Sequence, residues 1–211
     1  WLEVGGEHAD RALRLDPNNT DALEARGNLR YWGFLTDVDT DPAARQAALR
    51  AAQADLEKAT RIDKSQAGAF ATLSHLYYQL PDKTTNDVLM AAREALNADE
   101  FQANVTRLYS RLFNAAYDLG QISQADDYCR NLEVRNATDP RAVRCRLYLQ
   151  SAPGFPRYDV ARARRLADSL VALSSPADSL LARHTANMFV AATMARVSAD
   201  SPGYADSARA L

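Results

Sequence analysis

The residue types that could do chemistry are scattered along this 211-residue sequence. Its histidines, His8, His75 and His184, lie far apart, and a single imidazole forms neither a metal site nor a nucleophile–base pair. The cysteines, Cys129 and Cys145, lack the CxxC spacing of a zinc site. No phosphate-binding glycine loop, zinc-protease motif or nucleophile-elbow motif is present. The sequence therefore predicts no catalytic residue, no metal and no cofactor.

Two segments concentrate charge. Asp37, Asp39 and Asp41 alternate as calcium ligands do, but no glycine or distal glutamate follows at the spacing that a calcium loop needs, so we interpret them as an acidic loop before a helix. The stretch 141–165 holds seven arginines against Asp159 alone. It could receive an acidic partner, but we favour a solvated face whose arginines cover apolar neighbours.

The overall composition is that of a folded protein without a strong charge bias. The formal net charge of −2 gives no general attraction to nucleic acid. The longest apolar stretch, 188–195, is far too short to cross a bilayer. We expect no nucleic-acid partner and no membrane insertion, and we favour a cytoplasmic location.

Helices must position whatever site exists. Alanine, leucine and arginine dominate, while glycine and proline number only eight each, which is typical of a helical chain. Apolar residues recur three and four positions apart, as in Leu73, Leu76, Tyr77 and Leu80, so each helix buries one stripe. The pattern predicts helices at 2–15, 20–33, 43–62, 67–80, 85–98, 103–119, 122–135, 140–151, 158–173, 177–197 and 203–211.

The sequence also repeats itself. The segment 9–19 has the form A-x-x-A-L-x-L-D-P-N-N, and 56–66 and 92–99 repeat it, with a looser copy ending at Pro140. A small residue lies inside the helix that follows each copy, where it would let a partner helix approach closely. These residues are Gly27, Ser74 and Ser110 (or Phe113), and Ala186 follows later in the chain.

In these features the chain resembles the tetratricopeptide repeat (TPR) family, whose unit is a pair of antiparallel helices. The resemblance implies an all-α, right-handed superhelical solenoid of about five repeats with truncated ends. It covers 1–211 as a single repeat domain, which we expect to be a fragment of a larger protein. It is strongest in the first three copies of the motif and weakest after residue 150.

The resemblance also implies a concave groove, lined by the first helix of each pair, that binds a partner protein or peptide. Carrying the family's ligand-facing positions onto this sequence gives Glu24, Asn28, Tyr31, Trp32, Thr72, His75, Tyr78, Arg107, Arg111, Asn114 and Tyr117. Tyr31, Tyr78 and Tyr117 would then form a row that suits an extended peptide. The alternative is that these tyrosines pack between adjacent repeats.

Part of this set is similar to the carboxylate clamp with which some family members hold the acidic C-terminus of a chaperone. Asn28, Arg107 and Arg111 match that clamp, and guanidinium groups suit a carboxylate through paired hydrogen bonds. Glu24 stands where the clamp has lysine and Thr72 where it has asparagine, so we do not expect a chaperone clamp.

These features support two hypotheses of function. The first is a non-enzymatic scaffold that binds a peptide or protein segment in the groove. The second is a sensory or regulatory repeat module of a larger bacterial signalling protein, such as a serine/threonine kinase or a transcriptional regulator. An enzyme is the third and weakest reading.

The two cysteines should be neighbours. Cys129 and Cys145 flank a turn near 136–139 at similar distances, so they lie at similar height on consecutive antiparallel helices. We expect them within about 10 Å of each other, although a bridge also needs converging Cβ atoms. In a reducing compartment the default is two free thiols, and we expect a disulfide only if the domain is exported.

Overall fold

The computed structural model describes residues 2–36, 41–101, 103–198 and 208. Within these residues the regular structure consists of ten α-helices and one short 3₁₀ helix, without a strand. The predicted all-α class is confirmed. The helix predicted at 203–211 lies outside the described residues except for Ala208.

The chain divides into two compact units, Trp1–Arg111 and Leu112–Leu211, which are called unit 1 and unit 2 below. The boundary falls inside one helix, so the first half of that helix belongs to unit 1 and the second half to unit 2. Whether 1–211 forms a single repeat domain, as the resemblance implies, stays a prediction.

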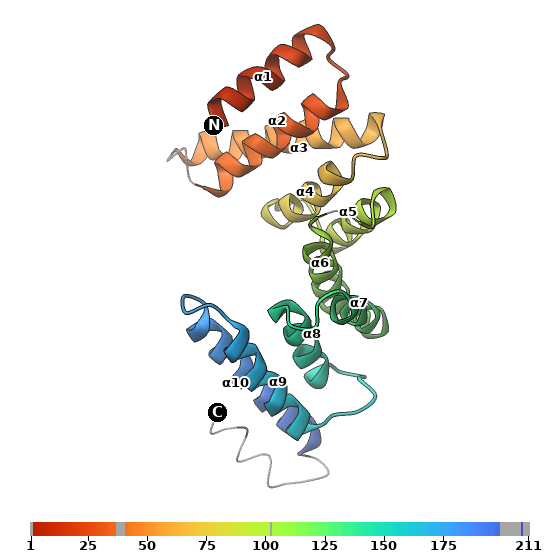
Figure 1. Cartoon of the computed structure of the whole chain (residues 1–211), viewed down its shortest axis with the longest axis vertical. Coiled ribbons are helices and arrows are strands. Elements are labelled where there is room, and N and C mark those ends of the chain that lie inside the picture. The colour runs from red at the N-terminus through yellow and green to blue at the C-terminus, as the bar shows by residue number, and fades with distance from the viewer. Residues whose placement is uncertain (1, 37–40, 102, 199–207, 209–211) are drawn as a thin grey trace. The chain divides into compact units, whose positions relative to one another are not determined.

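Unit 1 is built from consecutive helices that pack against one another in sequence order (Figure 1). Contacts join each helix to the next from α1 to α4, and α4 to α5, and α2 also contacts α4. The elements are α1 (Leu2–Leu15), α2 (Thr20–Leu35), α3 (Pro42–Ile62), α4 (Ala67–Leu76), η1 (Tyr77–Gln79), α5 (Thr85–Ala98) and the first half of α6 (Val105–Asp118).

The core of unit 1 depends on a close approach of α2 to α3. Leu23, Leu49, Leu56 and Leu73 are almost completely buried in it. A Cβ atom on Gly27 would lie 2.6 Å from the Leu56 side chain, so only glycine allows this separation of the two helices. The predicted role of the small residue in this helix is confirmed here.

In unit 2, too, consecutive helices pack against one another in sequence order (Figure 1). Each helix from α7 to α10 contacts the next, and α8 also contacts α10. The elements are the second half of α6, α7 (Ile122–Arg135), α8 (Pro140–Ser151), α9 (Val160–Leu173) and α10 (Ser179–Val197). Leu147, Ala163, Ala186 and Met194 are buried in its core.

Side-chain caps set where several helices begin. Asn19 accepts a hydrogen bond from the Ala22 amide at the start of α2, and Asp159 accepts one from Arg162 at the start of α9. At α5, Thr84 and Asp87 form a reciprocal capping box. Asp139 caps α8, and Pro140 takes the first helical position, where no amide hydrogen is needed. These residues explain why the predicted starts of the helices lie close to the observed ones.

Two predicted boundaries differ from the structure. The α-helix predicted at 67–80 ends at Leu76, and residues 77–79 form the tighter η1 turn, because Pro81 cannot continue the hydrogen-bond ladder. The loop expected at 33–42 is shorter, since α2 extends to Leu35. Asp41 caps α3 through the amides of Ala43 and Ala44, as an acidic helix-entry residue does. Asp37 and Asp39 lie outside the described residues.

Candidate functional site

Unit 1 contains a cleft of about 280 Å³ between α2, α4 and the start of α6, called the unit 1 cleft below. It brings together eight of the eleven residues predicted to face a ligand. The eight are Glu24, Asn28, Tyr31, Trp32, Thr72, His75, Arg107 and Arg111.

One side of the cleft is apolar and open to solvent. Trp32 is 49% exposed and Leu35 is 36% exposed, although both are large hydrophobic side chains. They lie three residues apart on α2, so they share a face of that helix. Ala71 and Thr72 of α4 also line the cleft. An exposed apolar surface inside a cleft is typical of a binding site.

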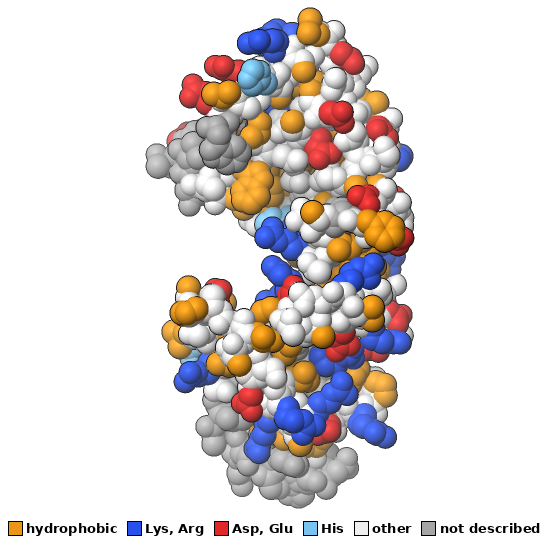
Figure 2. All heavy atoms as spheres, viewed as in Figure 1, with side chains coloured by type: hydrophobic (Ala, Val, Ile, Leu, Met, Phe, Trp, Pro, Cys, Tyr) orange, Lys and Arg blue, Asp and Glu red, His pale blue; other side chains and the backbone are white. Residues whose placement is uncertain are grey.

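The other side of the cleft is cationic. Arg111 donates hydrogen bonds to the Ala71 carbonyl at 2.7 Å and to the Ser74 hydroxyl at 3.0 Å, which ties α6 to α4. Arg107, one turn earlier on α6, is exposed and has no ion pair or hydrogen bond with any described residue. Figure 2 shows basic side chains beside apolar ones on the face in view.

The positive charge acts on His75. Burial lowers the pKa of His75 below its ordinary value, and the nearby Arg111 and Arg107 lower it further. The imidazole is therefore held neutral by its surroundings, since a proton on it would be desolvated beside two guanidinium groups.

Tyr31 and His75 form a hydrogen-bonded pair, with 3.0 Å between the Tyr31 hydroxyl and Nδ1 of His75. Burial raises the pKa of Tyr31 to about 12, so the phenol stays protonated. The tyrosine is only 2% exposed and stacks on Phe34. The hydrogen bond between the two side chains therefore joins α2 to α4.

Glu24 lines the cleft and contacts the start of α4. Its carboxylate accepts hydrogen bonds from the Ala69 amide and from Asn28, and a Cβ atom on Gly68 would lie only 2.1 Å from Oε1. It therefore covers the N-terminus of α4, where Gln66 provides no side-chain cap. Burial raises the pKa of Glu24 above its usual value despite these hydrogen bonds.

Three predicted groove residues do not line this cleft. Tyr78 lies in η1 and is 43% exposed. Because Tyr31 is a core residue and Tyr78 a surface residue, the interpretation that these two occupy equivalent places in a tyrosine row is wrong. The half-buried Asn114 and Tyr117 belong to unit 2, and the Tyr117 ring lies 5.7 Å from that of Phe113 and 5.8 Å from that of Tyr148. Tyr117 thus packs in an aromatic cluster, as the alternative reading of the tyrosines had it.

The structure adds residues to the cleft that the sequence analysis did not select: Leu35, Gly68, Ala71 and Asn104. A signal existed for Leu35, which follows Trp32 at helical spacing. Gly68 and Ala71 line the cleft because α4 packs against α2, and Asn104 lines it from the residue before α6. No local pattern encodes this packing.

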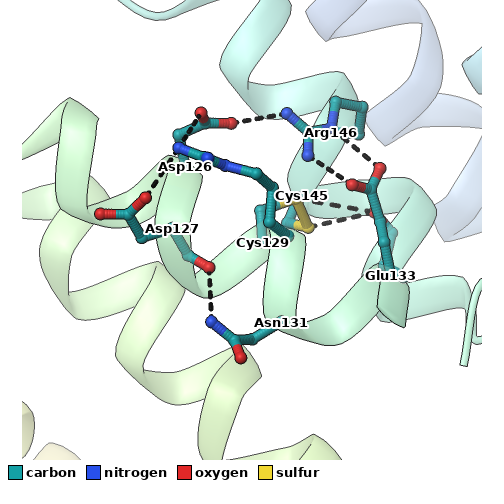
Figure 3. Close-up of polar contacts among 9 residues, drawn as sticks. Asp126, Asp127, Cys129, Asn131, Glu133, Cys145 and Arg146 are labelled. Carbon is teal, nitrogen blue, oxygen red and sulfur yellow. Dashed lines mark hydrogen bonds and ion pairs between the residues drawn. A yellow bond between two sulfur atoms is a disulfide. The ribbon is translucent and has the colours of Figure 1, made fainter. Parts of the chain in front are cut away.

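Unit 2 contains a disulfide between Cys129 of α7 and Cys145 of α8, with Cα atoms 5.7 Å apart (Figure 3). The prediction that the two residues are neighbours is confirmed. The expectation of two free thiols is wrong, because both side chains are buried, face each other across the helix pair and lie within bridging distance.

The bridge lies beside a network of ion pairs (Figure 3). Arg146 is 8% exposed and donates two hydrogen bonds to Glu133 and one, at 2.6 Å, to Asp126. Arg146 belongs to the basic stretch at 141–165, so that stretch is not uniformly a solvated face. Arg157, Arg162, Arg164 and Arg165 are exposed, as expected of such a face.

Two other features are absent from the described residues. No group of three or more histidine, cysteine, aspartate or glutamate side chains in that part of the chain is placed to hold a metal ion. None of the described helices is long and apolar enough to cross a membrane.

No protein-family model matches this chain, and no curated protein matches it. A similar solved structure is the crystal structure of BtubC (BKLC) from P. vanneervenii, with a TM-score of 0.60 and 16% sequence identity. The likeness covers 99% of this chain and 87% of that one. At this identity it shows a shared helical fold and carries no information on the ligand.

Proposed function

We propose that this chain is a non-enzymatic interaction module that binds a segment of a partner protein in the unit 1 cleft. The observation that carries the proposal is the exposure of Trp32 in a cleft that Arg107 also lines. Tryptophan and arginine are the side chains that most often dominate binding energy in protein interfaces.

The chemistry of the cleft favours a segment with an acidic residue next to an apolar one. Arg107 offers a guanidinium group that no described carboxylate occupies. Glu24, the one acidic residue of the lining, is engaged by α4 and Asn28, which reduces the repulsion expected from the sequence. Trp32 and Leu35 provide the apolar surface.

The size of the cleft supports side chains of a peptide as the occupant. Pockets for drug-sized ligands and cofactors measure roughly 300–1,000 Å³ and enclose most of the ligand. The unit 1 cleft, at about 280 Å³, lies just below that range. A few side chains of a longer segment would fill it, while the rest of the segment lies on the surface.

The proposed architecture around this site is a tetratricopeptide-type array. The repeated motif, the small residues inside the helices and the contacts of α2 with α4 and of α8 with α10 support it. In such an array we expect a right-handed superhelix.

We also propose that the chain works in an oxidising compartment, in place of the cytoplasmic location favoured from the sequence. Disulfides persist in exported and extracytoplasmic proteins and are rare in a reducing cytosol. Alkylation of the protein in intact cells, followed by mass spectrometry, tests this. A bridged Cys129–Cys145 pair in cells supports the proposal, and two alkylated thiols contradict it.

The binding proposal is tested with a peptide library screened on the whole chain, followed by fluorescence polarisation of the best binder. Trp32→Ala should weaken binding by about thirty-fold, as expected for a hot-spot side chain worth about 2 kcal/mol. Arg107→Gln should weaken it by about ten-fold through loss of a charge-assisted hydrogen bond.

Two matched variants serve as controls for this experiment. Leu15→Ala removes an apolar side chain that is 86% exposed and lies outside the cleft, and Arg61→Gln removes an exposed charge on α3. Both should bind as the wild type does. If Trp32→Ala and Arg107→Gln also bind normally, the unit 1 cleft is not the site.

A further inference from the structure

Unit 2 contains a larger cavity, of about 520 Å³, which no step of the proposed function uses. It is called the unit 2 cavity below. Its lining comes from α8, the end of α9 and the start of α10, and all of it lies within unit 2. The lining residues that matter for its chemistry are Arg141, Arg144, Tyr148, Leu170, Leu181 and Asp178.

The charged side chains that line this cavity differ in whether another described residue pairs with them. Arg141 is held by an ion pair with Asp139 at 3.1 Å. Asp178, the acidic residue of the lining, accepts a hydrogen bond from the Ser175 hydroxyl at 2.6 Å. Arg144 is half-buried and has no ion pair or hydrogen bond with any residue that the structure describes. The cavity therefore has one guanidinium group that is available to an anion.

Arg144 acts on the neighbouring phenol. Burial raises the pKa of Tyr148, and the charge of Arg144 opposes that rise. Both side chains extend from α8, four residues apart, into the same lining. A bound carboxylate could accept a hydrogen bond from the arginine, and the protonated Tyr148 hydroxyl lies within the same lining as a second donor.

The remaining lining is aliphatic. Leu170 and Ala182 are buried at the base of the packing between α9 and α10, whereas Leu181 is 69% exposed. A large exposed leucine at a cavity is a surface that a ligand's apolar part would cover. The unit 2 cavity is thus lined by both the guanidinium group of Arg144 and an exposed apolar surface.

We propose that the unit 2 cavity is a second binding site, which takes a carboxylate joined to a branched aliphatic group. Such chemistry occurs in a peptide segment with glutamate next to leucine, and also in a free aliphatic acid. The proposal gives a role to Arg144, the member of the basic stretch at 141–165 that is neither ion-paired nor fully exposed. It does not depend on the unit 1 cleft, since no residue is shared between the two sites.

The test is an NMR titration of the whole chain, labelled at leucine and threonine methyl groups. One pair of probes is the peptide acetyl-Leu-Glu-Leu-amide and its neutral match acetyl-Leu-Gln-Leu-amide. The other pair is 4-methylpentanoate and 4-methylpentanamide. The acids should shift the methyl signals of Leu170, Leu181 and Thr185, which line the cavity, and the neutral probes should bind at least five-fold more weakly.

Variants assign the effect to Arg144. Arg144→Gln should weaken binding of the acid at least five-fold, and Arg144→Lys should restore part of it by keeping the charge. Arg164→Gln, an exposed arginine of the same basic stretch outside the cavity lining, should bind as the wild type does. Trp32→Ala, which tests the unit 1 cleft, should leave these shifts unchanged.

The outcomes separate the two sources of the ligand. Binding of the peptide alone identifies a protein segment as the occupant, and equal binding of 4-methylpentanoate identifies a small acid. The proposal is overturned if neither acid shifts the cavity methyl signals, if acid and amide bind equally, or if Arg144→Gln has no effect. Unchanged spectra of Arg144→Gln outside the cavity exclude unfolding as the cause of a loss.

Discussion

Each unit of the chain contains a cluster of three charged side chains that joins two helices, but the two clusters have opposite compositions. In unit 1, Asp55 of α3 accepts hydrogen bonds from both Arg26 and Arg30 of α2. In unit 2, Arg146 of α8 donates to both Glu133 and Asp126 of α7. Unit 1 thus places one anion between two cations, and unit 2 places one cation between two anions.

The two clusters also differ in the additional contacts that connect their helices. Arg26 makes a further ion pair with Asp10 at 2.8 Å, so the unit 1 network joins α1, α2 and α3 without a covalent link. The unit 2 network joins only α7 and α8, and the Cys129–Cys145 bridge joins the same two helices. A covalent bond therefore acts in unit 2 where a third helix acts in unit 1.

The two units should therefore be destabilised by the loss of different side chains. In unit 1 the loss of one carboxylate, Asp55, leaves two arginines without their shared partner. In unit 2 the loss of one carboxylate leaves Arg146 with the other, and the disulfide still holds the helices together. We expect unit 1 to depend on a single side chain and unit 2 on its bridge.

Asp55→Asn should have the largest effect on stability. Removing one partner of a buried ion pair costs about 3–5 kcal/mol, and we expect the lower end, about 3 kcal/mol, because both arginines are partly exposed. The measurement is the free energy of unfolding in urea, with hydrogen exchange to locate the loss in α2 and α3.

The matched control for Asp55→Asn is Asp82→Asn. Asp82 pairs with Arg50 at 2.6 Å, but both side chains are largely exposed, so we expect a loss below about 1 kcal/mol. Equal losses in the two variants would show that burial of the Asp55 network contributes nothing to unit 1.

Replacing both cysteines, as Cys129→Ala with Cys145→Ala, should have the next largest effect and should act on unit 2. A bridge that spans a sequence separation of 16 residues contributes roughly 2–3 kcal/mol by restricting the unfolded chain. Hydrogen exchange should rise in α7 and α8 and stay unchanged in α2 and α3.

Reductant provides the control for the bridge. Dithiothreitol should destabilise unit 2 of the wild type and should leave the double alanine variant unaffected. If reductant loosens α2 and α3 of the wild type as much as α7 and α8, the two units do not have the separate dependences that we infer.

The smallest effect concerns pH and His75. Because the pKa of His75 is lowered in the folded state, the unfolded chain binds more protons than the folded chain just below the ordinary histidine pKa of about 6.5. The contribution of His75 to stability is therefore complete above about pH 6.5 and is lost as the pH falls from there toward the folded-state pKa.

His75→Gln should remove this part of the pH dependence. The difference in unfolding free energy between wild type and variant, measured from pH 7.5 to pH 5, isolates His75, because the other titrating groups are common to both chains. Glu24, whose pKa is raised, contributes with the opposite sign and cancels in this difference. A difference that stays constant over this range would show that neither burial nor the two arginines lower the pKa of His75.

Local sequence determined the helices and their order along the chain. Periodic apolar residues and caps such as Asp139-Pro140 act within one or two turns, so the order of helices could be read without a structure. The same local geometry placed Cys129 beside Cys145, because both flank one short turn. Of the eleven residues that the resemblance to a repeat family suggested, eight line one cleft in the structure, and their role in binding stays a prediction.

Tertiary packing decided the environment of each side chain. Tyr31 and Tyr78 have the same side chain, yet one is 2% exposed and the other 43%, because α2 is covered by α4 while η1 ends at the surface. Arg144 and Arg146 lie two residues apart on α8, so they face different sides of the helix. One lines a cavity and the other is buried against two carboxylates. Burial depends on which helices cross, and those crossings join residues far apart in the chain, beyond the reach of any local pattern.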